Sequence, residues 1–177
     1  MRARMPALLG AVVAAAIGTA GVVAAASGST ATAADEQPSL VENFLYPGAD
    51  TIFANTGIRL ISGDGHILFA DCATPRTGDI GLMRVRTTDS IGTNHDGLIC
   101  FQVKAVPGVL ALKIPAVYEI RGDGYAAGAG HHVKADLTTD AGQRSTVDVN
   151  PSGSTPVGVG AGPNNAPTTL LQLTASS

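Results

Sequence analysis

The sequence predicts an all-β fold: a single domain built as an antiparallel β-sandwich or jelly roll and closed by one disulfide bond. Short apolar or alternating runs, about nine to eleven of them, recur between turns rich in Gly, Pro, Asn and Asp. No long stretch has a convincing 3.6-residue apolar period, the mark of an amphipathic helix. The chain has two cysteines, enough for one disulfide. Regularly spaced short strands without long helices are typical of sandwiches and jelly rolls.

The first segment, residues 1–33, is expected to be a signal peptide. Arg2 and Arg4 give it a basic start, residues 6–26 are almost wholly apolar, and residues 31–33 are small enough for a signal peptidase site. The alternative is a retained membrane anchor, because the apolar run approaches spanning length. Its Ala and Gly content and the cleavage pattern favour removal and release of the product.

Two further parts are expected after the signal peptide. Residues 34–48 form a polar leader in which Ser39 and Glu42 fit a capping box, so a short helix is predicted over 39–45. The β-sandwich domain itself is expected to occupy residues 49–177.

The charge balance argues against a nucleic-acid partner. Loss of Arg2 and Arg4 from the 11 basic residues leaves nine, against 14 acidic ones, a formal charge of −5. A protein that binds through nucleic-acid phosphates needs a basic surface. The chain also has only seven aromatic residues and no Trp, so stacking platforms for bases or sugars are scarce.

The stretch 57–72 is the most informative part of the domain. Its apolar runs, 58–61 and 67–70, flank Gly63-Asp64-Gly65, which favours a tight turn, so the stretch predicts a β-hairpin. A second Gly-Asp-Gly triplet, residues 122–124, is interpreted as reuse of the same turn chemistry. The glycine-rich loop that follows it, 124–130, is expected to be mobile.

The remaining strands follow from alternation of apolar and polar residues or from short apolar runs between breakers. They are expected to begin at 51–54 and then to cover 80–88, 98–103, 109–114, 117–121, 132–138, 145–149, a short piece at Val157 and Val159, and 168–174.

Cys72 and Cys100 are expected to form a disulfide. An even pair of cysteines in an exported chain is most often oxidised. Closing a loop of this size stabilises a fold by about 3–4 kcal/mol in the chain-entropy model.

No catalytic motif stands out. The chain lacks a G-x-S-x-G elbow. Its four histidines could meet Asp64, Asp96 or Asp136 in the folded protein, but sequence spacing does not show whether they do. His131 and His132 are neighbours on a strand and therefore point to opposite faces, which is unsuitable for one metal ion. Calcium is the one possible cofactor, with Asp64, Asp123 and Asp136 as candidate ligands in or beside turns.

The candidates for contact with a ligand are Arg121, Asp123, Tyr125, His131 and His132. Arg121, Gly122 and Asp123 spell an Arg-Gly-Asp tripeptide, which is expected at an exposed loop tip. A strand end followed by a Gly-Asp-Gly turn gives the same letters and is the preferred explanation over an adhesion function. Tyr125 lies in the glycine-rich loop and is the aromatic residue expected to be most exposed. His131 and His132 complete the set.

Two resemblances concern origin and function. The Ala/Gly/Thr/Asp-rich, Lys-poor chain with its signal segment resembles small secreted proteins of actinobacteria. Residues 145–149, the following STPVGVG and TTLLQLT resemble the final strands of jelly-roll carbohydrate-binding modules. The likeness covers about the last third of the chain and includes no functional motif, so it implies sugar binding only as an expectation.

The function expected from the sequence is that of a secreted, non-catalytic binding module, released outside a bacterial cell. Its partner would be an extracellular protein or a glycan, with no nucleic acid and no membrane after cleavage. The alternatives are a carbohydrate-binding module of the cell surface or wall, a small hydrolase with an unrecognised His/Asp site, and an inhibitor that offers a loop to a secreted protease.

Overall fold

The computed structural model describes residues 44–176. The expected signal peptide and nearly all of the leader, including most of the helix expected over 39–45, lie outside the described residues. Leu45, at the end of that expected helix, instead forms a β-bridge with Ser62. Within the described part of the chain, no helix is long and apolar enough to cross a membrane.

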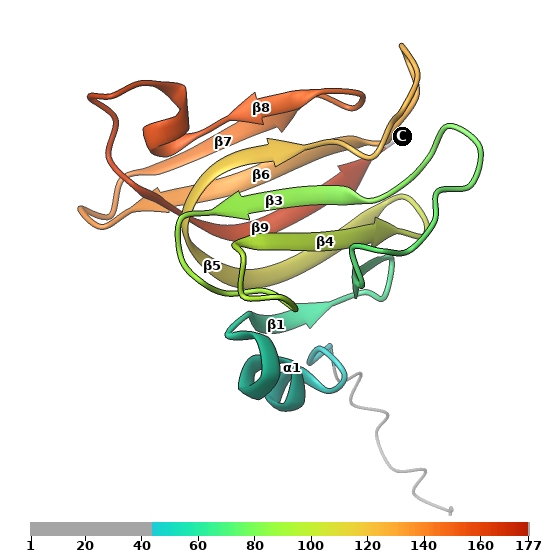
Figure 1. The fold of residues 1–177 in the computed structure, drawn as a ribbon, viewed down its shortest axis with the longest axis horizontal. Coiled ribbons are helices and arrows are strands. Elements are labelled where there is room, and N and C mark those ends of the chain that lie inside the picture. Colours follow the sequence, from blue (N-terminus) through green and yellow to red (C-terminus); the bar gives the residue numbers. More distant parts are fainter. Residues whose placement is uncertain (1–43, 177) are drawn as a thin grey trace, which may run out of the picture. The chain divides into compact units, whose positions relative to one another are not determined.

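The fold is mostly β, as predicted, and nine strands form one antiparallel sheet (Figure 1). Its main path runs β2-β4-β3-β5-β9-β6-β7, while β1 and β8 also pair with β5. The strands and helices in chain order are α1 (Ala49–Thr56), β1 (Arg59–Gly63), β2 (Ile67–Ala70), β3 (Met83–Thr87), β4 (Leu98–Val103), β5 (Gly108–Arg121), β6 (His132–Thr139), β7 (Arg144–Val149), β8 (Ser154–Pro156), the 3₁₀ helix η1 (Gly158–Ala161) and β9 (Thr168–Ser176). The finer description as a sandwich or jelly roll stays a prediction, because the strands form one continuous sheet.

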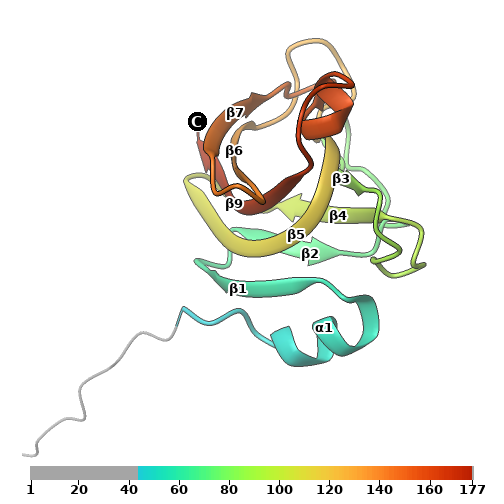
Figure 2. The ribbon, with the colours of Figure 1, turned by 90° about the vertical axis from the view of Figure 1, so that its left-hand side faces the viewer.

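Strand β5 connects the two halves of this sheet. It merges the two strands expected at 109–114 and 117–121 into one of 14 residues. Its first half pairs with β1 and β9, and its second half with β3 and β8. Figure 2 shows β5 as one strongly curved strand.

The curve coincides with Pro115 and Ala116. Proline has no N–H for the ladder, and Ala116 has a positive φ of 51°. The register with β9 shifts between Ile114 and Val117, as at a bulge. The carbonyl freed at Pro115 accepts a hydrogen bond of 2.6 Å from the Thr87 hydroxyl. A proline that was expected to end a strand therefore bends one.

The prediction of a hairpin in residues 57–72 is wrong, although both of its arms are strands. β1 pairs with β5, and β2 pairs with β4. The turn is held to β5, because the Val109 amide donates to Asp64 Oδ2 (2.9 Å) and the Asp64 amide donates to the Val109 carbonyl (3.2 Å). Apolar runs show which segments are buried; they do not show which strand lies next to which.

The strand expected to begin at 51–54 is wrong as well. This segment belongs to α1, which lies between Gly48 (φ 69°) and Gly57 (φ 74°). The Gly57 amide donates to the Phe53 carbonyl in the αL arrangement that commonly ends a helix. The glycines that bound the segment, with the αL cap at Gly57, outweigh the β-branched Thr51 and Ile52 in between.

The short strand expected at Val157 and Val159 is also displaced. The strand, β8, precedes it, and η1 covers Gly158–Ala161. A side chain at Gly160 would place its Cβ 2.0 Å from the Tyr118 carbonyl oxygen, so the chain passes close to β5 here.

The core follows the predicted alternation. In β3, Met83, Val85 and Thr87 are buried, while Arg84 and Arg86 face the other way. The largest fully buried side chains come from the residue before β1 and from strands β2, β3, β4, β5 and β9. They are Phe101, Ile58, Ile67, Met83, Ile99, Leu110, Leu112, Ile114, Ile120, Leu170, Leu173 and Val85.

The predicted disulfide is confirmed. Cys72 and Cys100 are joined across 28 residues, with their Cα atoms 5.2 Å apart. Cys100 is fully buried in β4, whereas Cys72 follows β2 in the connection towards β3. The bond therefore fixes the start of the long connection between β2 and β3 to β4, the strand next to β2.

Replacing both cysteines by Ala is expected to lower the free energy of unfolding by about 3–4 kcal/mol, because the 28-residue loop is no longer closed in the unfolded chain. Urea unfolding of the double variant and the wild type measures this directly. A loss below about 1 kcal/mol would show that the bond constrains little beyond what the sheet already holds.

Candidate functional site

The outer face of β3 and β5 carries a row of arginines. Arg84 of β3 lies directly opposite Arg121 of β5, and Arg86 lies opposite Glu119. Arg86 Nε is 3.5 Å from Glu119 Oε1, so this second pair is an ordinary cross-strand ion pair. The first pair places two positive charges side by side.

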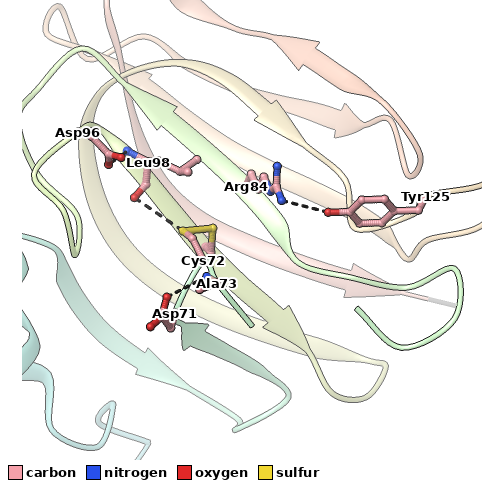
Figure 3. The surroundings of a disulfide bond; sticks show 8 residues. Asp71, Cys72, Ala73, Arg84, Asp96, Leu98 and Tyr125 are labelled. Carbon is pink, nitrogen blue, oxygen red and sulfur yellow. Dashed lines mark hydrogen bonds between the residues drawn. A yellow bond between two sulfur atoms is a disulfide. The ribbon is translucent and has the colours of Figure 1, made fainter. Parts of the chain in front are cut away.

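Tyr125 contacts both Arg84 and Arg121 and also a third arginine, Arg76. Arg84 Nη2 donates to the Tyr125 hydroxyl (3.1 Å), and the guanidinium carbons of Arg121 and Arg76 lie 5.0 and 5.1 Å from the ring centroid. We refer to Arg76, Arg84, Arg121 and Tyr125 as the arginine–tyrosine cluster. Figure 3 shows Arg84 reaching from β3 to Tyr125 on one side of the Cys72–Cys100 bond.

The backbone holds Tyr125 in place. Its amide donates to the Asp79 carbonyl (2.9 Å), and the Gly81 amide donates to the Asp123 carbonyl (2.7 Å). A Cβ at Gly81 would lie 2.3 Å from Cε2 of Tyr125, so the ring rests on the bare backbone there. Tyr125 is nevertheless 38% exposed, in agreement with the expectation that it reaches solvent.

The cluster carries three positive charges without a negative partner. Within the described part of the chain, the ion pairs involve Arg86, Lys134, His66 and His131, and none involves the three clustered arginines. Arg84 Nε is moreover buried without a hydrogen-bond partner in residues 44–176. In a chain with more acidic than basic residues, this is a local concentration of unpaired positive charge.

The position of Asp123 corrects the expectation that the Arg-Gly-Asp tripeptide lies at an exposed loop tip. Its side chain is 1% exposed, because Oδ1 accepts from the His131 amide (2.8 Å) and Oδ2 lies 2.6 Å from His131 Nδ1. The pair joins the two ends of the glycine-rich loop. The tripeptide thus does not form an exposed tip.

The glycines beside Asp123 explain why the segment turns inward. Neither Gly122 nor Gly124 has a positive φ. A Cβ would lie 2.2 Å from the Pro151 carbonyl oxygen at Gly122 and 2.2 Å from the Ala129 carbonyl oxygen at Gly124. Here glycine allows close backbone approach, whereas the sequence pattern indicated a turn.

The histidines are scattered. His131 is half-buried against Asp123, whereas His132 begins β6 and is exposed. His66 Nδ1 contacts the Pro107 carbonyl and lies 3.7 Å from Asp64 Oδ2 on the surface. One histidine of the four therefore has a buried carboxylate beside it.

The candidate calcium ligands are also apart. Asp64 accepts from the backbone amides of His66 and Val109, Asp123 holds His131, and Asp136 accepts from the Thr146 hydroxyl (2.5 Å). In residues 44–176, no three His, Cys, Asp or Glu side chains gather into a possible metal site.

Sequence reasoning named two members of the cluster, Arg121 and Tyr125, and missed Arg76 and Arg84. The outward alternation of Arg84 was visible in the sequence. Its position opposite Arg121 was not, since it depends on strand pairing. Arg76 lies in the connection between β2 and β3 and carries no periodic signal.

No protein-family model and no curated protein matches this chain. The interpretation of the cluster therefore rests on its geometry and charge.

Replacing Gly122 by Ala is expected to lower the free energy of unfolding by about 1–3 kcal/mol, because the new methyl group meets backbone that cannot move aside alone. Thermal or urea unfolding measures the loss.

The matched control for Gly122→Ala is Gly162→Ala. Gly162 has a φ of 163°, and a Cβ there approaches only the Asn165 side-chain amide, at 3.3 Å. Equal stability of the two variants would contradict the close approach at Gly122.

Proposed function

We propose that this chain is an extracellular, non-catalytic binding module that contacts its ligand through the arginine–tyrosine cluster. The observation that carries the proposal is the gathering of Arg76, Arg84 and Arg121 around one exposed tyrosine, with no carboxylate of residues 44–176 in ion-pair contact. Arginine and tyrosine are the residue types that most often dominate binding surfaces.

The extracellular setting is supported by the disulfide and by the features of the first 33 residues. Disulfides persist in oxidising compartments and are rare in reducing ones. The basic start and apolar run of the chain agree with export.

The contact is expected to come from the arginines, with the tyrosine as their support. Two guanidinium groups lie over the Tyr125 ring, and its hydroxyl already accepts from Arg84. A sugar that stacks on an aromatic face would have to displace them. A carbohydrate ligand, the alternative expected from the sequence, would thus be held through charged or hydrogen-bonding groups.

The non-catalytic reading is supported by the surroundings of the histidines. A nucleophile needs a base within hydrogen-bond reach. In the described residues, the hydrogen bonds of histidine rings go to a backbone carbonyl and to a carboxylate, and none goes to a hydroxyl.

Replacing Arg121 by Ala is expected to weaken ligand binding by about tenfold or more, the loss typical of a binding hot spot. An array of extracellular glycans and proteins identifies the ligand, and titration of the purified variants measures the affinity.

Arg59→Ala is the matched control, because Arg59 also lies over an aromatic ring, 4.3 Å from the centroid of Phe53, and is outside the cluster. A ligand that binds the wild type, Arg121→Ala and Arg59→Ala equally well would place the binding surface elsewhere.

A hydrolase is the second candidate, favoured by one observation. The buried Asp123 carboxylate orients a half-buried imidazole through Nδ1, which is the arrangement of a histidine general base. Under the binding proposal, a panel of chromogenic esters, glycosides and peptides shows no hydrolysis that depends on His131. Hydrolysis lost in His131→Ala and kept in His132→Ala, with both variants folded, would favour the enzyme.

A further inference from the structure

The three arginines reach the cluster from three separate segments. Arg84 comes from the start of β3, Arg121 from the end of β5, and Arg76 from the connection between β2 and β3. Their guanidinium groups meet at one tyrosine, because Arg84 donates to its hydroxyl and those of Arg76 and Arg121 lie near its ring.

This arrangement is electrostatically unfavourable by itself. Like charges directly opposite each other on neighbouring strands destabilise a sheet, and Arg84 and Arg121 are such a pair. The partnerless, buried Nε of Arg84 adds a further cost. A negative group beside the cluster would offset the repulsion between Arg84 and Arg121, so its binding energy includes that relief.

We propose that the arginine–tyrosine cluster binds a tetrahedral oxyanion, a phosphate or sulfate group, either free or as an ester. The inference rests on the proposed function, for which it names the ligand chemistry. Each guanidinium presents a planar fork of donors that matches two oxygens. A tetrahedral group offers three or four oxygens, enough to accept from more than one guanidinium at once, whereas a carboxylate offers two oxygens in one plane.

The remaining charge restricts the ligand further. Outside the three clustered arginines, acidic residues predominate, so a long nucleic acid would meet repulsion beyond the cluster. The site therefore fits isolated anionic groups better than a continuous phosphate backbone.

Titration of the purified protein with inorganic phosphate, with sulfate and with acetate at constant ionic strength tests this directly. Two-dimensional NMR that includes the arginine Nε–Hε signals locates the site. We expect saturable binding of phosphate or sulfate that shifts the Arg84 and Arg121 signals, and acetate binding about tenfold weaker.

Arg84→Gln and Arg121→Gln are each expected to weaken oxyanion binding about tenfold, since each removes charge-assisted hydrogen bonds. Arg59 is a stacked arginine outside the cluster, so Arg59→Gln is expected to keep the oxyanion affinity within about twofold of the wild-type value. Thermal unfolding establishes that each variant folds. If Arg84→Gln does not fold, Arg121→Gln decides the matter.

A sugar phosphate and dextran sulfate, with neutral dextran as control, distinguish the source of the anion. Tighter binding of the esters than of the inorganic ions indicates an ester ligand, and equal binding indicates the free anion; both support the inference. Absence of saturable binding by every oxyanion, acetate binding equal to phosphate, or equal affinities in Arg121→Gln and Arg59→Gln would overturn it.

Failure of this inference differs from failure of the proposed function. If an array ligand loses affinity in Arg121→Ala while phosphate, sulfate and their esters do not bind, the binding module stands and the oxyanion is wrong. If oxyanions bind at the cluster while array ligands bind Arg121→Ala as well as wild type, the oxyanion stands and the proposed contact surface is wrong.

Discussion

The bend of β5 is the constraint on which the rest of the structure depends. Pro115 cannot donate to a ladder, and Ala116 takes a positive φ, so a 14-residue strand changes direction without ending. Each half then pairs with two different strands, and the buried faces of β1, β3, β5 and β9 meet in one core. The same bend carries Arg121, at the far end of β5, to the position opposite Arg84. The cluster is thus a consequence of the topology, because no local sequence signal brings these arginines together.

The segment that follows β5 positions Tyr125 in the arginine–tyrosine cluster. Gly122 and Gly124 let the backbone pass close to Pro151 and Ala129, which turns Asp123 inward to His131. Tyr125, two residues after Asp123, then lies against Gly81 with its hydroxyl towards Arg84. The buried Asp–His pair therefore has a positioning role for the exposed surface, whether or not it has any chemistry of its own.

The sequence was informative where a single segment decides the outcome. Alternation and apolar runs predicted β2 and β4 with their observed bounds, and the even cysteine pair predicted the disulfide. Pairing was beyond reach, because an apolar run specifies burial and leaves the neighbour open; hence the wrong hairpin at Gly63-Asp64-Gly65. The Gly-Asp-Gly at 122–124 shows the same limit: glycine at a turn and glycine at a close approach look identical in sequence. Arg121 and Tyr125 were found as single residues, whereas their meeting with Arg76 and Arg84 required the fold.

The proposed ligand site is the arginine–tyrosine cluster, and its proposed ligand is a tetrahedral oxyanion. The most direct measurement is a crystal structure of the protein soaked in selenate, a tetrahedral anion whose selenium is located by anomalous scattering. The account predicts an anomalous peak within hydrogen-bond reach of the guanidinium groups of Arg84 and Arg121. A well-diffracting soaked crystal with no peak at the cluster, while selenate occupies other arginines such as Arg59 or Arg144, would contradict it.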